Sequence, residues 1–269
     1  MDAGGSSGPP RGVLPFDPAE SAALAMARAR VLERIEHACR RSGRNPAEVR
    51  LVSVSKTVTA ERLRAALAAG IATFGENRVA EALGKVDAVP GASWHLIGPL
   101  QSNKARRAVG AFAMIETIDS LDLARRIDRL AGEIHRERPL PVLLQVNVDA
   151  DPAKAGFAPG GLGRDLVALL ALPNLDVRGL MTVGRLVGEA ELARPTFAAL
   201  RRLSGRLRVE QPGLGPELSM GMSDDYPVAV EEGATIVRVG RAIFGSRAVP
   251  MDRPRVSARP EPGDSTEVA

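Results

Sequence analysis

The stretch PVLLQVNV at residues 141–148 decides the fold, because it is the longest and most apolar of several short segments with strand character. A strand with one face in water alternates apolar and polar residues, whereas a nearly continuous apolar strand is typical of a parallel sheet covered on both faces. We therefore predict that residues 141–148 form a buried strand of a parallel sheet.

Seven similar segments lie on either side of this stretch. They are RLVSVS (50–55), IATFG (71–75), SWHLIG (93–98), FAMIETI (112–118), LDVRGLMTV (175–183), ELSMG (217–221) and TIVRVG (235–240). Segments with helical periodicity lie between or before them, at about 18–42, 60–70, 76–88, 121–137, 188–209 and 224–233. Thr59, Ser120 and Ser223 stand where three of these helices would take an N-cap.

Eight strands that alternate with helices indicate parallel βα units. For a chain of 269 residues, the simplest arrangement is a single (β/α)8 TIM barrel, which here has an extra N-terminal helix. A doubly wound open sheet is the alternative, which periodicity alone does not exclude. We expect the barrel at residues 17–249, between a disordered leader (1–16) and a disordered tail (250–269), both rich in proline and small polar residues.

Composition narrows the possible functions. The chain has 36 basic and 32 acidic residues, a net charge of +4, and 3% aromatic residues, so a binder of single-stranded nucleic acid is not expected. A single cysteine and three histidines argue against a disulfide framework and against a structural zinc site. There is no long apolar run and no basic, apolar start, so we expect a cytoplasmic protein without a membrane contact.

The functional site of such a barrel lies at the carboxyl ends of its strands. These ends carry Lys56, Glu76, Asn77, His95, Thr117, Asn147, Met181, Thr182, Ser219, Arg238 and Gly240. Lys56 is unusual because it directly follows a buried strand, where partial desolvation would favour a neutral, nucleophilic amine. A lysine whose ammonium simply extends to solvent is the alternative.

The loops after the seventh and eighth strands are the usual phosphate site of this barrel. Gly240 would let the backbone approach an anion, the amides of Gly240 and Arg241 could open a short helix, and Ser219 could add a hydroxyl donor. In a closed barrel the first and eighth strands are neighbours. An aldehyde that also carries a phosphate would satisfy both Lys56 and this cradle, and pyridoxal 5′-phosphate (PLP) is such a cofactor.

Six motifs in this chain resemble those of the pyridoxal phosphate homeostasis protein family. They are VSVSKT (52–57), FGENR (74–78), WHLIGPLQSNK (94–104), RGLMTV (178–183), LSMGMSDDY (218–226) and VRVGRAIFG (237–245). The resemblance runs from Leu24 to Arg247, and the family is similar to the barrel domain of alanine racemase, the type III PLP fold, without its second domain.

The resemblance implies the roles of the cofactor-binding residues. Lys56 would form the internal aldimine and Asn77 would lie beside the cofactor. Ser219 and the backbone of Gly240 and Arg241 would hold the phosphate. Arg238 would face the pyridine nitrogen, where a permanent cation weakens the electron sink.

Four residues leave questions open. Arg78 stands where many family members have a tyrosine, which removes a ring from the neighbourhood of the cofactor. Arg241 stands where a threonine often follows the glycine, so its backbone amide remains but a hydroxyl contact to the phosphate is lost. His95 would either touch the cofactor or be a packed, hydrogen-bonded histidine. Lys154 matches a family lysine that could take up a vitamer, although a solvated loop lysine is the simpler interpretation.

Three functions are compatible with these features. The first is a protein without robust catalysis that holds, buffers or delivers PLP and related B6 vitamers, with PLP-dependent apoenzymes as recipients and the protein itself a monomer. The second is a type III PLP enzyme such as an amino-acid racemase, which needs a second base. The chain has one tyrosine, Tyr226, and no room for a second domain after the barrel, so we favour the first. The third, a basic interaction module, is favoured only by the small positive charge.

Overall fold

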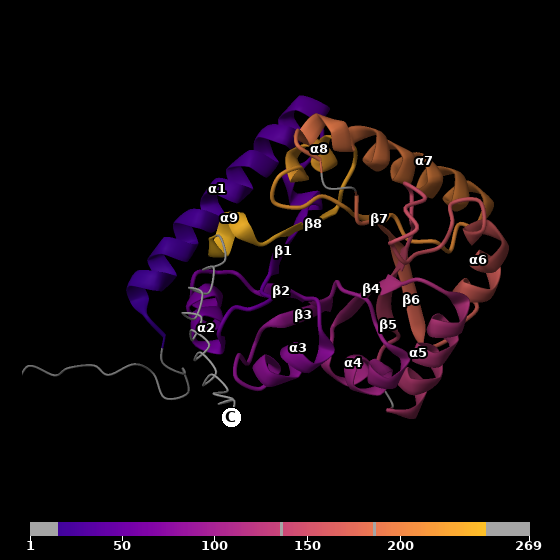
Figure 1. The fold of residues 1–269 in the computed structure, drawn as a ribbon, viewed down its shortest axis with the longest axis horizontal. Helices are drawn as coiled ribbons and strands as arrows, with labels where there is room; N and C mark the ends of the chain where they lie inside the picture. Colours follow the sequence, from indigo (N-terminus) through magenta and orange to yellow (C-terminus); the bar gives the residue numbers. More distant parts are fainter. Residues whose placement is uncertain (1–15, 135–136, 185–186, 246–269) are drawn as a thin grey trace, which may run out of the picture.

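The computed structural model describes residues 16–134, 137–184 and 187–245, which form a closed barrel of eight parallel strands surrounded by helices (Figure 1). The strands are β1 (Arg50–Val54), β2 (Thr73–Glu76), β3 (Ser93–Leu96), β4 (Met114–Ile118), β5 (Leu140–Gln145), β6 (Leu175–Met181), β7 (Glu217–Ser219) and β8 (Ile236–Val239). The eight predicted strands are thus confirmed, and the open sheet is excluded.

The α-helices lie outside the barrel. They are α1 (Pro18–Ser42), α2 (Ala60–Ala68), α3 (Val79–Val86), α4 (Ala105–Ala111), α5 (Leu121–Glu133), α6 (Leu162–Leu170), α7 (Arg194–Glu210), α8 (Tyr226–Glu231) and α9 (Arg241–Phe244). Short 3-10 helices occur at η1 (Pro46–Glu48), η2 (Ser102–Lys104) and η3 (Ala190–Ala193). The helical segments α4 and α6 were not among those derived from periodicity. None of the described helices is long and apolar enough to cross a membrane.

Two of the three predicted helix caps are confirmed. The side chain of Thr59 accepts a hydrogen bond from the amide of Arg62, and that of Ser120 accepts one from Leu123, so α2 and α5 begin as expected. The third was wrong: α8 begins at Tyr226 after Asp225, and the hydroxyl of Ser223 accepts a hydrogen bond from the amide of Gly240 instead.

The barrel closes where β1 pairs with β8. Val52 lies opposite Arg238, and Ser53 lies opposite Val239. This pairing brings the end of β1, which carries Lys56, beside the end of β8, which leads through Gly240 into α9. The end of β1, where an aldehyde would bind, and the loop after β8, where a phosphate would bind, are therefore neighbours.

The extra N-terminal helix α1 is confirmed and lies along the outside of the ring beside α2, α8 and α9 (Figure 1). Asp17 caps its start, and Gly43, whose φ of +66° suits glycine, ends it. The predicted leader, apart from Phe16, and the predicted tail lie outside the described residues.

The interior of the barrel has an apolar layer, formed by Val52, Met114, Leu143, Met181 and Ile236. Successive side chains of a strand point to opposite faces, so the residue two positions further along faces the same way. Glu116 follows Met114 in this manner, and Arg238 follows Ile236. The apolar layer thus supports a layer with buried charges, nearer the carboxyl ends of the strands.

Candidate functional site

Lys56 lies in a tight turn immediately after β1. The amide of Val58 donates to the carbonyl of Ser55 at 3.0 Å, which closes the turn around Lys56 and Thr57. Thr57 has a φ of +66°, a left-handed conformation that costs a residue with a side chain roughly 1–2 kcal/mol. Lys56 is half-buried, and no hydrogen bond or ion pair engages its ammonium within the described residues. Its amine is thus available to a carbonyl ligand.

Three charged side chains lie behind this turn: Lys85 of α3, Glu76 of β2 and Glu81 of α3. The Lys85 ammonium donates to Oε1 of Glu76 at 2.7 Å, to Oε1 of Glu81 at 2.7 Å and to the carbonyl of Ser55 at 2.9 Å. Glu76 is fully buried and also accepts from the hydroxyl of Ser55 at 2.7 Å. The cluster therefore contacts the peptide chain next to Lys56.

The environments of the two carboxylates differ. Burial raises the pKa of Glu76 despite the hydrogen bonds from Lys85 and Ser55. Burial also opposes the ionisation of Glu81, but hydrogen bonds from Lys85 and from the amide of Thr57 lower its pKa below the ordinary value. Glu81 is thus the carboxylate that its surroundings hold in the charged form.

A second buried network crosses the interior of the barrel. Nη1 of Arg238 donates to the hydroxyl of Ser219 at 2.6 Å, and that hydroxyl donates to Oε2 of Glu116 at 2.5 Å. Oε1 of Glu116 lies 2.7 Å from Nδ1 of His95. Nη2 of Arg238 donates to the carbonyl of Thr182 at 2.8 Å. Four strands, β3, β4, β7 and β8, thus contribute one side chain each to a continuous chain of hydrogen bonds.

The charges in this network stabilise one another. Burial alone would raise the pKa of Glu116, but the hydrogen bond from His95 and the charges of His95 and Arg238 hold it below the ordinary value. Burial lowers the pKa of Arg238, which the carboxylates of Glu116 and Asp225 oppose. Arg238 is 4% exposed, so its guanidinium is fixed rather than solvated.

The end of β8 and the loop after β7 meet where the sequence predicts a phosphate cradle. The hydroxyl of Ser223 lies 3.2 Å from the amide nitrogen of Gly240, which precedes α9. The first amides of a helix have no acceptor within it, so those at the start of α9 are free to bind an anion. A Cβ atom at Gly240 would lie 3.2 Å from Cβ of Val54, so glycine allows β8 to end close against β1.

The remaining predicted residues have clear positions. Asn77 is half-buried directly after β2, and its backbone packs so closely on Gly98 that a Cβ there would collide with it. Arg78 and Arg241 are exposed, and Arg241 forms an ion pair with Asp224. Lys154, on the loop after β5, donates to the carbonyl of Val183 at 3.2 Å.

His95 is buried and hydrogen-bonded, as one of its two interpretations predicted. Sequence reasoning missed Glu116, Lys85 and the contact of Ser223 with Gly240. A signal for Glu116 was present, since it is a lone acid within the apolar segment FAMIETI. No group of three or more His, Cys, Asp or Glu side chains in the described part of the chain is arranged to hold a metal ion.

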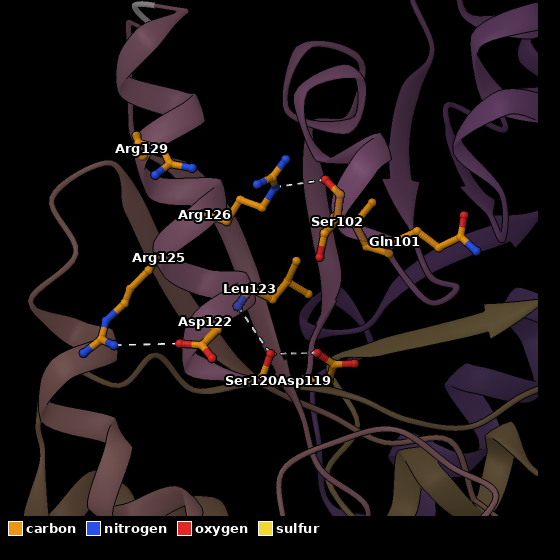
Figure 2. Close-up of a pocket in the computed structure, with 10 residues that line it drawn as sticks. Gln101, Ser102, Asp119, Ser120, Asp122, Leu123, Arg125, Arg126 and Arg129 are labelled. Carbon is orange, nitrogen blue, oxygen red and sulfur yellow. Dashed lines mark hydrogen bonds and ion pairs between the residues drawn. The ribbon is translucent and has the colours of Figure 1, made fainter.

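Two surface hollows lie away from these residues. One, of about 550 Å³, lies between the segment before α4 and the helix α5, and Figure 2 shows its arginine-rich lining. There Arg126 donates to the carbonyl of Ser102 at 2.9 Å, and Arg125 pairs with Asp122. The other, of about 560 Å³, lies between α1 and η1. Neither is lined by Lys56, Arg238 or Gly240, so the site is defined by the strand ends rather than by these hollows.

The residues present fit PLP. Lys56 offers an unengaged amine, the Ser223 hydroxyl and the first amides of α9 offer donors, and Arg238 offers a buried cation in the barrel interior. The donor set thus matches an aldehyde, a phosphate and an aromatic ring nitrogen.

Comparison with known proteins shows the family of this chain. Residues 29–248 match the family described as alanine racemase, N-terminal domain. Pyridoxal phosphate homeostasis proteins from Aquifex aeolicus and Pseudomonas aeruginosa are 42% and 44% identical over 220 and 223 residues. Each alignment covers 81% of this chain, and 96% and 94% of the respective relative.

Solved structures show the same relationship. PipY from Synechococcus elongatus PCC7942, solved with PLP bound, is 41% identical with a TM-score of 0.72, covering 82% of this chain and 100% of PipY. Alanine racemase from Clostridium difficile is 14% identical with a TM-score of 0.63, covering 81% of this chain and 59% of that enzyme, a likeness of fold. This chain belongs to the pyridoxal phosphate homeostasis protein family, which shares the barrel of the alanine racemase N-terminal domain.

Proposed function

We propose that this protein binds PLP covalently through Lys56 and holds, buffers or delivers it, without robust catalysis. The observation that carries the proposal is the pairing of β1 with β8, which places the Lys56 turn beside Gly240 and Arg238. Homologues at about 40% identity are named for PLP homeostasis, and PipY has been solved with PLP bound.

Each predicted residue has one task in this proposal. PLP supplies an aldehyde that a lysine amine can capture and a phosphate that anchors it. Lys56 binds the aldehyde carbon, and Asn77 lies at the neighbouring strand end. The amides of Gly240 and Arg241 hold the phosphate, and the Ser223 hydroxyl joins them.

Ser219 and Arg238 act together. The Ser219 hydroxyl, which we expected to hold the phosphate, is engaged by Arg238 and Glu116, so we place Ser223 ahead of it as a phosphate donor. Arg238, fixed by Ser219 and Thr182, would direct its cation at the pyridine nitrogen. A cation there opposes protonation of that nitrogen and so weakens the electron sink that amino-acid chemistry needs.

The racemase alternative needs a second base, and the one tyrosine of the chain is a poor candidate. Tyr226 is fully buried, and the guanidinium of Arg34, from α1, lies 5.2 Å from the centre of its ring. Its ring therefore faces the outer helix layer. Burial raises the pKa of its hydroxyl, which has no hydrogen-bond partner in the described structure. Such a tyrosine is poorly placed to exchange protons with a ligand in the barrel mouth.

The absorption spectrum of the purified protein, with PLP and with added alanine or serine, tests the proposal. We expect a visible band from bound PLP and no stereospecific turnover above that of free PLP. Robust turnover that disappears in Lys56→Ala would favour the racemase alternative, and the absence of any bound band would refute PLP binding.

The proposal also covers the proteins that receive PLP. We propose PLP-dependent apoenzymes as the recipients, B6 vitamers as further ligands, and a monomer acting in the cytoplasm. Mixing the loaded protein with a PLP-dependent apoenzyme should restore that enzyme faster than free PLP released from the protein can. Equal rates would argue for storage rather than delivery, and light scattering measures the oligomeric state.

A further inference from the structure

Lys85 is not among the residues that would touch the cofactor, and the role assigned to it below rests on the proposed role of Lys56. Lys85 is 7% exposed, and its ammonium has three hydrogen-bond acceptors, which matches its three N–H donors. A lysine that merely compensated a buried carboxylate would need only one acceptor. The identity of the other two acceptors points to a further task.

Those acceptors lie on both sides of Lys56. Lys85 donates directly to the carbonyl of Ser55, the residue before Lys56. It also donates to Oε1 of Glu81, and the same oxygen accepts the amide of Thr57, the residue after Lys56, at 2.5 Å. One ammonium therefore fixes both peptide units that flank Lys56, one directly and one through a carboxylate.

The turn needs such support because of its conformation. Thr57 is β-branched and adopts a φ of +66°, which β-branched residues rarely do. Without external hydrogen bonds, a turn of this kind relaxes toward negative φ values, and the direction in which Lys56 leaves the backbone changes with it. The two anchored peptides oppose that relaxation.

We propose that Lys85, together with Glu81, is the positioning element that aims the amine of Lys56 at the aldehyde of PLP. Lys85 contributes no contact to the phosphate cradle, which is built from Ser223, Gly240 and α9. Its loss should therefore weaken capture of the aldehyde and leave recognition of the phosphate unchanged.

The test compares two ligands that differ at one group. PLP carries the aldehyde, whereas pyridoxine 5′-phosphate carries an alcohol in its place and binds only through the ring and phosphate. The variant is Lys85→Met with Glu76→Gln, because Lys85→Met alone would leave the buried Glu76 carboxylate without its cation. Glu81→Ala is a milder second variant, since Glu81 is partly exposed and links only Thr57 to Lys85.

We expect both variants to bind PLP about ten- to a hundred-fold more weakly than the wild type, the range that small misplacements of a reacting group produce. Their affinity for pyridoxine 5′-phosphate should not change. Arg194→Met is the matched control, because Arg194 also pairs with three carboxylates, but these belong to η3, to α8 and to the residue after α8, and none contacts the Lys56 turn. It should alter the affinity for neither ligand. Parallel loss of both affinities in the two variants, or loss of neither, would overturn the positioning role.

Failure of the proposed function is recognised separately. If the wild type gives no borohydride-trapped adduct on Lys56, the covalent role of Lys56 fails. The turn is then judged in the ligand-free protein by hydrogen exchange at the Thr57 amide. Faster exchange in Lys85→Met/Glu76→Gln than in the wild type supports the anchoring by Lys85, and equal exchange rates would refute it.

Discussion

Arg238 and Glu116 carry opposite charges inside the barrel and are joined through one hydroxyl, that of Ser219, by hydrogen bonds of 2.6 and 2.5 Å. Because the Ser219 hydroxyl lies between them, the Glu116 carboxylate stabilises the Arg238 guanidinium without covering all of it. Arg238 therefore keeps a fixed direction while burial excludes water from around it. A cation held in this way is suited to face a ring nitrogen rather than to move during a reaction.

The first prediction concerns Arg238. Arg238→Gln should weaken PLP retention by about ten- to a hundred-fold, because a hydrogen bond to a charged group is worth about 1.5–3 kcal/mol. The covalent adduct on Lys56 should still form, since it depends on the amine and the phosphate cradle. Equilibrium dialysis and peptide mapping measure the two effects.

The same substitution removes a positive charge near the buried Glu116 carboxylate, so a control for the stability of the fold is needed. Arg238→Gln with Glu116→Gln removes both charges and should unfold at a higher temperature than the single variant. Unchanged PLP retention in this folded double variant would contradict a role of Arg238 in binding.

The second prediction separates the two serines. The hydroxyl of Ser223 contacts the amide of Gly240, so Ser223→Ala should reduce the preference for PLP over pyridoxal, which lacks the phosphate. Ser219→Ala should instead weaken the binding of both ligands to the same extent, because the Ser219 hydroxyl holds Arg238 in place. Titration of each variant with both ligands measures the preference. If Ser219→Ala alone reduces it, the phosphate role expected from the sequence is correct and the assignment to Ser223 is not.

The third prediction is a pH dependence of stability. Although burial opposes its ionisation, Glu231 pairs with Arg194 and Arg41, which lower its pKa below the ordinary value of 4.5. A carboxylate with a lowered pKa stabilises the fold above its unfolded pKa and loses that contribution as the pH falls through the folded value. Glu231→Gln should thus melt below the wild type at neutral pH, by about 2–4 °C for a loss near 1 kcal/mol.

The difference should shrink as the pH falls from about 4.5 through the lowered pKa of the folded carboxylate, because below that pKa the wild-type side chain is neutral as well. Thermal melts between neutral and acidic pH measure it. Glu33→Gln, on an exposed part of α1, is the control and should melt like the wild type throughout. A difference that stays constant with pH would show that Glu231 acts through packing and not through charge.

The sequence predicts the features that depend on neighbouring residues. The eight strands follow from short apolar segments, and Lys56 and Gly240 follow from their positions just after two of them. The caps at Thr59 and Ser120 are equally local, since each serves an amide three residues ahead. These assignments needed no knowledge of which strands would meet.

The buried networks depend on strand order and register. Ser219 and Glu116 are 103 residues apart in the chain, and only the closed barrel brings β4 and β7 within reach of one hydroxyl. In the sequence, Lys85 is one polar residue of an amphipathic helix, and only the structure shows that it lies against the Lys56 turn. The sequence predicts Ser223 as a helix cap because capping is a common role of a serine before a helix. Its actual partner, Gly240, lies 17 residues further along the chain.

The most direct test of PLP binding through Lys56 is to reduce the PLP-loaded protein with borohydride and map the modified peptide by mass spectrometry. The cofactor mass should be found on Lys56, and Lys56→Ala should lose it. An adduct confined to Lys154 or Lys104 in the wild type would contradict it.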